Sequence, residues 1–449
     1  MQRKTFGKKT SRGQRPRVDR FVAPRDSFEE LRMRSSWNVD DRPTLDIWFS
    51  KYLQKKKYVS YLDEAFGLET LPKQNSPDNG KKQYFVQPWP CVPRKKRYLS
   101  SADSILDLPS YGVAPFPDLL DWSNDNILVA ALGRSYHKWS WRTQSLVNSG
   151  FTAQEIHCCK FDPRGELLLL GTSPRMVEVH NNVNSKVSYF AVCSCSHLIN
   201  PSCDITALDW SPTGNSFVAG CSFGMISSFT RDARPISSVS YVHKTVLMVR
   251  VSPNARQLAA SVIDHTTIFI YSWPELALLS SINSPEWTTK VFAWHPWRTS
   301  FLGIAAMQGD VSRLATWDIN TDTMSSVTLS HSQYVVDTLL FSHRTGEMVL
   351  SLWHPDASLS YPKNNSHLLV LSDPETVVDQ WGEGRGGLDR VRTMVFSPDG
   401  TKLATATADE DLIIWNFLPE DTQKINTNSR RLSAMPVFLD ETTYGLSIR

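Results

Sequence analysis

The amino-acid sequence predicts an all-β fold, a closed β-propeller of seven blades, and two observations carry this prediction. From about residue 100 onward, short runs rich in Val, Ile, Leu and Trp alternate with turn-forming pairs such as Ser-Pro and Asp-Gly, without a long helical pattern. One short unit, an apolar anchor followed by a turn and a further apolar strand, also recurs along the chain. Units of this kind bury their apolar faces by stacking on one another.

The anchors of the repeated unit set its period. They are Trp122, Phe161, Trp210, Val251, Trp294, Phe341 and Phe396. Successive anchors lie 39 to 55 residues apart, which matches the ~40–45-residue period of the WD repeat with loop insertions. Seven such repeats of four strands fit a closed WD-repeat propeller. The alternative, a β-sandwich with chance spacing, does not account for seven matched units.

The segments that flank the repeats predict a basic arm and a polar tail. Residues 1–25 hold nine Lys or Arg and one acid without a helical or strand period, which is typical of a disordered segment. Apolar residues at 3–4 spacing within 42–66 predict one or two short amphipathic helices. Residues 100–117 are expected to supply the strand that closes the ring beside the seventh blade. The expected division is 1–96 as a flexible arm, 97–420 as the propeller and 421–449 as a flexible tail.

Composition narrows the functional classes. The 449 residues are 41% hydrophobic and 21% charged, which excludes a wholly disordered chain. No apolar run approaches the ~18–20 residues of a membrane span, and the residues after Met1 lead into no apolar run of the kind that predicts a secretory signal. These features predict a reducing compartment and no membrane partner. The expected location is the cytoplasm and nucleus. A net charge of +3, with two aromatic residues in the basic arm, does not favour a nucleic-acid partner.

The sequence contains no recognisable catalytic constellation. Neither a Gly-x-Ser-x-Gly nor a His-Glu-x-x-His motif occurs. The Gly-rich stretch 382–387 lacks the Gly-Lys-Ser/Thr ending of a phosphate-binding loop and reads as a connector between repeats. We expect no catalytic residue and no cofactor.

One group of soft ligands resembles a metal site. Cys193, Cys195 and His197, with Cys203 nearby, would offer four ligands to zinc. However, Cys-x-Cys is not the usual zinc spacing, and the segment falls between the second and third repeats. The sequence therefore favours a surface loop with free thiols and no bound metal.

Two short motifs outside the repeats have the character of docking peptides. Residues 19–25 place an apolar pair between arginines, and a guanidinium can pair with a carboxylate while the aromatic ring fills a pocket. The C-terminal pair Ile448-Arg449 presents an aliphatic anchor, a guanidinium and a terminal carboxylate.

Together with motifs at the edges of the repeats, these residues resemble the Fizzy-type co-activators of the anaphase-promoting complex or cyclosome (APC/C), a ubiquitin ligase. The further motifs are Arg97-Tyr98-Leu99-Ser100, Ile105-Leu106-Asp107-Leu108-Pro109, Leu120-Asp121-Trp122-Ser123, Trp294 to Trp297 and Arg390 to Gly400. The resemblance implies a non-catalytic adaptor that binds degron peptides on its propeller, while the ligase transfers ubiquitin. A generic WD-repeat scaffold in another assembly is the alternative.

The resemblance also assigns roles to particular residues. It implies a C-box that docks on the tetratricopeptide-repeat scaffold of the ligase, formed by Asp19, Arg20, Phe21, Val22, Pro24 and Arg25, and a second docking element at Ile448 and Arg449. Ala23 stands where the family usually has proline. Asp121 and Arg390 match positions of a pocket for Lys-Glu-Asn degrons. Asp118 and Glu420 lie close to positions of family acids in an Arg-x-x-Leu groove between blades one and seven. The implied substrates are cell-cycle proteins such as mitotic cyclins.

Overall fold

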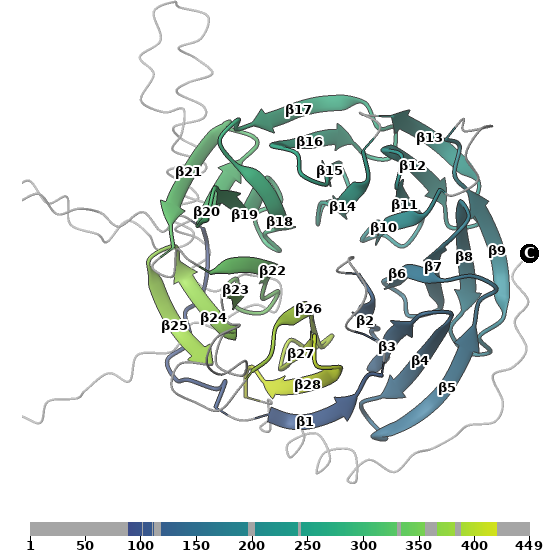
Figure 1. The fold of residues 1–449 in the computed structure, drawn as a ribbon, viewed down its shortest axis with the longest axis horizontal. Helices are drawn as coiled ribbons and strands as arrows, with labels where there is room; N and C mark the ends of the chain where they lie inside the picture. Colours follow the sequence, from purple (N-terminus) through teal and green to yellow (C-terminus); the bar gives the residue numbers. More distant parts are fainter. Residues whose placement is uncertain are drawn as a thin grey trace, which may run out of the picture. The chain divides into compact units, whose positions relative to one another are not determined.

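The computed structural model describes residues 89–419, apart from 101, 110, 112–117, 196–202, 241–243, 330–333, 355–365 and 382–387. All of the described residues belong to one compact unit, residues 85–449. The described residues form seven four-stranded antiparallel sheets arranged in a ring (Figure 1). A cavity lies among the inner strands, and we call this central region the channel. Within the described part, no helix is long and apolar enough to cross a membrane. The predicted helices of 42–66, the C-box, Glu420 and the Ile-Arg end lie outside the described residues.

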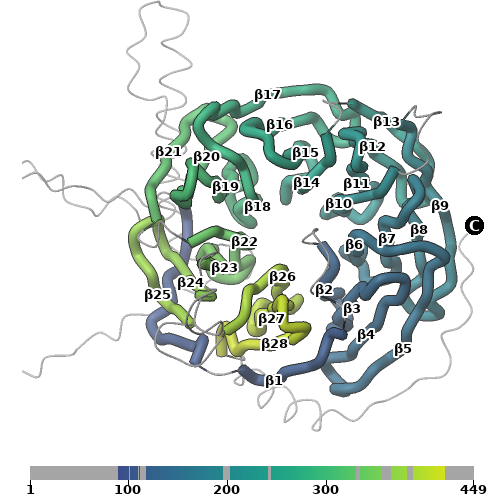
Figure 2. Tube along the Cα trace, viewed as in Figure 1, coloured from purple at the N-terminus to yellow at the C-terminus, as the bar shows by residue number. Residues whose placement is uncertain are grey.

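In the first six blades the strands run in chain order from the channel outward, and the seventh runs β26, β27, β28 and then β1, as the tube view shows (Figure 2). The inner strands are β2 (Leu120–Trp122), β6 (Ile156–Phe161), β10 (Ile205–Trp210), β14 (Val246–Val251), β18 (Thr288–Trp294), β22 (Val335–Phe341) and β26 (Val391–Phe396). The second strands are β3 (Ile127–Leu132), β7 (Leu167–Thr172), β11 (Ser216–Cys221), β15 (Gln257–Val262), β19 (Phe301–Gln308), β23 (Met348–Trp353) and β27 (Lys402–Thr407).

The third and outer strands complete the blades. The third strands are β4 (Ser135–Ser140), β8 (Met176–Asn181), β12 (Met225–Thr230), β16 (Thr267–Ser272), β20 (Val311–Asp318), β24 (Ser366–Asp373) and β28 (Asp411–Asn416). The outer strands are β5 (Ser145–Phe151), β9 (Val187–Val192), β13 (Pro235–Ser240), β17 (Leu278–Asn283), β21 (Thr323–Thr328), β25 (Thr376–Trp381) and, in the seventh blade, β1 (Ala102–Asp107).

The seven predicted anchors are the last residues of the seven inner strands, so the repeat period read from the sequence is confirmed. Most residues of the second strands are buried, because neighbouring blades cover both of their faces. The blades approach so closely that some positions admit only glycine. A Cβ at Gly220 in β11 would lie 2.5 Å from a methyl group of Val246 in the next blade.

The ring is closed by β1, which comes before the first blade in the sequence but completes the seventh. It pairs antiparallel with β28, from Ala102 opposite Trp415 to Asp107 opposite Asp411. Figure 1 shows this strand as the outermost arrow of the last blade. The predicted closing strand within residues 100–117 is therefore confirmed.

Residues 89–99, which we call the strap, pack on blades five to seven, although the sequence assigned 89–96 to the flexible arm. Trp89 is fully buried, with its ring edge-on to Phe341 at 5.9 Å between centroids. His295, from the Trp294 to Trp297 motif, donates Nε2–H to the carbonyl of Pro90 at 2.9 Å. Burial lowers the pKa of His295 to about 4, which keeps the ring neutral at neutral pH.

Arg94 fixes the middle of the strap. Its guanidinium pairs with Glu347 at 2.8 Å and with Asp379 at 2.9 Å, and all three side chains are almost completely buried. The carboxylate of Asp379 also accepts the backbone N–H groups of Tyr98 and Leu99. The two acids lie more than 250 residues away in sequence. No local sequence pattern therefore predicts that the strap is ordered.

Replacing Arg94 with Met should destabilise the propeller by about 3–5 kcal/mol, because two buried carboxylates lose their counter-charge. Chemical unfolding followed by tryptophan fluorescence measures this change. The control is Glu166→Gln, which breaks the ion pair between Glu166 and Arg231. The Glu166 side chain is 64% exposed, so this change should lower the free energy of unfolding by less than ~1 kcal/mol. Equal stability of the two variants would contradict the role given to Arg94.

Candidate functional site

Charged residues line one half of the central channel. The residue just before the anchor is charged in the first four blades, with alternating sign: Asp121, Lys160, Asp209 and Arg250. In the last three blades the same position is apolar: Ala293, Leu340 and Val395. The channel therefore has a polar side and an apolar side.

Two ion pairs join charged residues of the channel. Asp121 forms an ion pair with Lys160 at 2.9 Å and also accepts the backbone N–H of Phe161. The Arg250 guanidinium makes a bidentate contact with the Asp118 carboxylate, with N···O distances of 2.6 and 3.0 Å. This contact ties the fourth blade to the segment that enters the first. Asp118 and Asp121 are both buried.

The electrostatic environment of Asp209 differs from that of its neighbours. Burial raises the pKa of this carboxyl to about 6, against the opposing effects of Arg250 and Lys160. Its carboxylate accepts the backbone N–H of Val251 at 2.7 Å. Burial lowers the pKa of Lys160, but Asp121 and other carboxylates outweigh that effect and the net shift is upward. Lys160 is therefore a fixed positive charge at neutral pH.

Arg390 belongs to a different ion pair. Its guanidinium contacts Asp337, at the start of the sixth blade, at 2.6 and 2.8 Å. It also lies 5.8 Å from the ring centroid of Trp353. Asp118 and Asp121 have other partners, Arg250 and Lys160. The structure thus brings Asp118 and Asp121 into one network and leaves Arg390 in another.

The sequence analysis missed Lys160, Arg250 and Asp337 as partners of the predicted residues. The first two stand directly before an anchor, so aligning the repeats on their anchors identifies them. A cavity of about 400 Å³ opens beside them in the channel, with Asp118, Lys160 and Arg250 among its lining.

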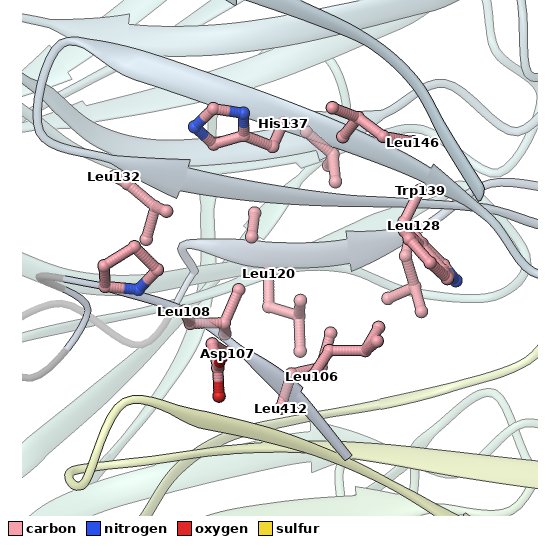
Figure 3. Close-up of a pocket in the computed structure, with 13 residues that line it drawn as sticks. Leu106, Asp107, Leu108, Leu120, Leu128, Leu132, His137, Trp139, Leu146 and Leu412 are labelled. Carbon is pink, nitrogen blue, oxygen red and sulfur yellow. The ribbon is translucent and has the colours of Figure 1, made fainter. Parts of the chain in front are cut away.

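A second cavity is an apolar groove between the seventh and first blades, with a volume of about 420 Å³. Its lining residues, most of them apolar, are Leu106, Asp107, Leu108, Pro109, Leu120, Leu128, Val129, Ala130, Leu132, His137, Trp139, Leu146 and Leu412. Figure 3 shows Leu106, Asp107 and Leu412 on one side, facing the strands that carry His137, Trp139 and Leu146. We call this cavity the blade 7–1 groove.

Asp107 is the acidic residue of the blade 7–1 groove. The resemblance placed Asp118 close to an acid position of this groove, but the structure places Asp118 in the channel, bound to Arg250. Asp107 lies opposite Asp411 in the pairing of β1 with β28. Directly opposed residues share one face of the sheet, and like charges there repel.

The cysteines between the second and third blades are not in a surface loop, so that expectation is wrong. Cys193, Cys195 and Cys203 are buried, and Cys221 at the end of β11 joins them. The four sulfur atoms lie within 4.8 Å of one another. His197 lies outside the described residues.

Comparison with known proteins shows the family of this chain. The family pattern "WD domain, G-beta repeat" matches residues 384–416. Protein cortex from Heliconius erato is 57% identical over 455 residues, which cover 100% of both chains. This chain belongs to the cortex family. Protein cortex from Biston betularia is 50% identical and covers 97% of each chain.

More distant relatives agree with the Fizzy-type resemblance of this cortex-family chain. The APC/C activator protein CDH1 of Saccharomyces cerevisiae is 23% identical and covers 78% of this chain and 60% of its own. An Arabidopsis thaliana protein named "Cell division cycle 20.5, cofactor of APC complex" is 24% identical over 82% of each chain. A chain from "Crystal Structure of Mitotic Checkpoint Complex" superposes with a TM-score of 0.58 at 18% identity, over 78% of this chain and 98% of that one. This last likeness confirms the fold.

Replacing Asp209 with Asn should change how stability depends on pH. The carboxyl has a pKa of about 6 in the folded protein and an ordinary value of 3.8. Its stabilising contribution is therefore fully present below about pH 3.8 and is lost as the pH rises through 6. The unfolding free energy of the unmodified protein minus that of Asp209→Asn should fall over this range by on the order of 1–3 kcal/mol.

Urea unfolding of both proteins at several pH values checks this expectation. The Asn side chain keeps an acceptor for the N–H of Val251, so the comparison isolates the charge. A difference that stays constant, or that rises with pH, would contradict the assignment of a raised pKa to Asp209.

Proposed function

We propose that this chain is an activator and substrate-recognition adaptor of the APC/C and is not itself an enzyme. The observation that carries the proposal is that relatives named as activators or cofactors of that complex align over 78% and 82% of the chain. The proposal extends to roles in cell division and meiosis and to residence in the cytoplasm and nucleus. A generic WD-repeat scaffold is the alternative, in which the terminal motifs have no ligase partner.

The blade 7–1 groove supports binding of an extended degron peptide of the Arg-x-x-Leu class. Its apolar lining suits a leucine side chain, and its volume of about 420 Å³ admits a few side chains. Asp107 offers a carboxylate to an arginine, and charge-assisted pairs of this kind are the stronger hydrogen bonds. An arginine there would also relieve the repulsion between Asp107 and Asp411.

The channel residues suit the other degron class less directly. Asp121 and Arg390 are the proposed residues for Lys-Glu-Asn peptides, but each is held by a partner, Lys160 and Asp337. A peptide would have to exchange these ion pairs for its own charges. The proposal therefore ranks the blade 7–1 groove above the channel as the principal degron site.

Docking on the ligase is assigned to the two terminal motifs. The proposed contacts are Arg20 and Arg25 of the C-box and the Ile448-Arg449 end, on tetratricopeptide-repeat subunits of the complex. Two weak docking peptides on one chain gain affinity because the second binds at high effective concentration. Mitotic cyclins are the proposed substrates.

Replacing Leu146 with Asp should weaken binding of a fluorescent Arg-x-x-Leu peptide at least tenfold. The change removes apolar lining from the groove and adds a charge where burying a leucine is worth about 1.5–3 kcal/mol. Leu279→Asp is the matched control, since Leu146 and Leu279 are 56% and 54% exposed on the outer strands β5 and β17.

Replacing Asp107 with Asn should weaken binding of the Arg-x-x-Leu peptide, but not of the same peptide with alanine in place of arginine. Fluorescence anisotropy measures these affinities and those of the unmodified protein for both peptides, and equal losses in both leucine variants would remove the groove from the proposal.

Capture of the APC/C tests the docking motifs. The full-length protein should bring down the complex, and Arg20→Ala combined with deletion of residues 448–449 should lose it, because both docking contacts are gone. The double variant should keep the groove peptide. If both proteins capture the complex equally, the propeller carries the contact. If neither does, the generic scaffold replaces the proposal.

A further inference from the structure

Four cysteines from three separate segments converge between the second and third blades. Cys193 and Cys195 follow the outer strand β9, Cys203 precedes the inner strand β10, and Cys221 ends β11. All four are buried and free of disulfide bonds. The chain holds seven cysteines, so more than half of them meet at this one place.

The separation of the sulfur atoms matches one tetrahedral ion. The four Sγ atoms lie within 4.8 Å of one another. A zinc ion with four Zn–S bonds of about 2.3 Å would hold its sulfur atoms about 3.8 Å apart, so small side-chain adjustments suffice. Cys193 and Cys195 meet this geometry despite their short spacing, because residues two apart in an extended segment point to the same side.

Arg175 organises the backbone around these sulfur atoms. Its Nη2 donates to the carbonyl oxygens of Cys193 and Cys195, each at 3.0 Å. Its backbone N–H donates to Cys203 at 2.6 Å, and its own carbonyl accepts the N–H of Cys193 at 2.8 Å. One arginine therefore fixes three of the four cysteine-bearing positions and places a positive charge beside them.

Cys221 carries a further sign of a ligand. Its Sγ accepts the backbone N–H of Phe223 at 3.4 Å. A backbone donor aimed at sulfur stabilises a thiolate, and hydrogen bonds of this outer kind orient and tune metal ligands. Four neutral thiols in an apolar core would need neither this donor nor the nearby guanidinium.

We propose that Cys193, Cys195, Cys203 and Cys221 bind one structural zinc ion. Binding of Zn²⁺ displaces four thiol protons to solvent and leaves a centre of net charge −2, which the Arg175 guanidinium partly offsets. All four positions of the tetrahedron are filled by protein, so the site is closed and structural. The ion joins the last strand of the second blade to the first two strands of the third. The close spacing fits one ion and not a multinuclear iron–sulfur cluster.

Metal analysis of the full-length protein, purified without chelators under reducing conditions, tests the proposal. We expect inductively coupled plasma mass spectrometry to find one zinc ion per chain. Cys203→Ser and Cys221→Ser should each lower zinc to background. The matched control is Cys91→Ser, because Cys91 lies outside the cluster and donates to the carbonyl of Ser372, a bond that serine can keep. Zinc retained at full level in both cluster variants would overturn the assignment.

A second measurement covers variants that fail to fold. Stepwise blocking of thiols in the unmodified protein with a mercurial should release the zinc as the cluster cysteines react, and cobalt substitution should give the absorption bands of a tetrahedral thiolate centre. Unmodified protein that stays metal-free after reconstitution with zinc would overturn the proposal. So would a disulfide between cluster cysteines in the freshly isolated protein, and iron in place of zinc would overturn the choice of metal.

Discussion

Closure of the ring by β1 and β28 is the constraint on which the rest of the structure depends. Each blade buries both faces against its neighbours, so an open ring would expose the faces of the first and seventh blades. Pairing of 102–107 with 411–416 joins the ends of the repeat array. The entropic cost of closing so long a loop grows only slowly with its length. Burial of apolar side chains at every interface between blades offsets this cost. The close approach at Gly220 shows how little space remains between blades.

The candidate binding surfaces follow from this closure. The chain passes from β1 to β2 at the junction of the seventh and first blades, and the residues of that passage, Leu106 to Pro109, form one wall of the blade 7–1 groove. The channel obeys a different rule, since one position in each repeat decides its character. Charged residues occupy that position in four blades, whereas apolar residues occupy it in three. Two ion pairs already occupy the polar half, whereas the blade 7–1 groove presents mostly apolar side chains and the carboxylate of Asp107.

The features that recur in every repeat could be predicted from the sequence, whereas contacts between distant parts of the chain could not. The seven anchors and the closing strand were predictable because turn chemistry and period are local signals. The order of the strap was not, because Arg94 finds Glu347 and Asp379 more than 250 residues away. Cys221 looks like an ordinary strand end in the sequence, and only the tertiary structure brings its sulfur within 4.8 Å of that of Cys193. The resemblance places Asp118 close to a position where the family has a groove acid, yet in the structure Asp118 pairs with Arg250 in the channel.

The position of β1 also has a consequence for synthesis. This strand leaves the ribosome about 300 residues before its partner β28 exists. At ~5–20 residues per second the interval is ~15–60 s. During that time the nascent chain carries an unpaired edge with Ile105 and Leu106 on opposite faces, a surface prone to wrong pairing. The ring therefore cannot close until the last blade has been translated, and residues 102–107 lack their native partner until then.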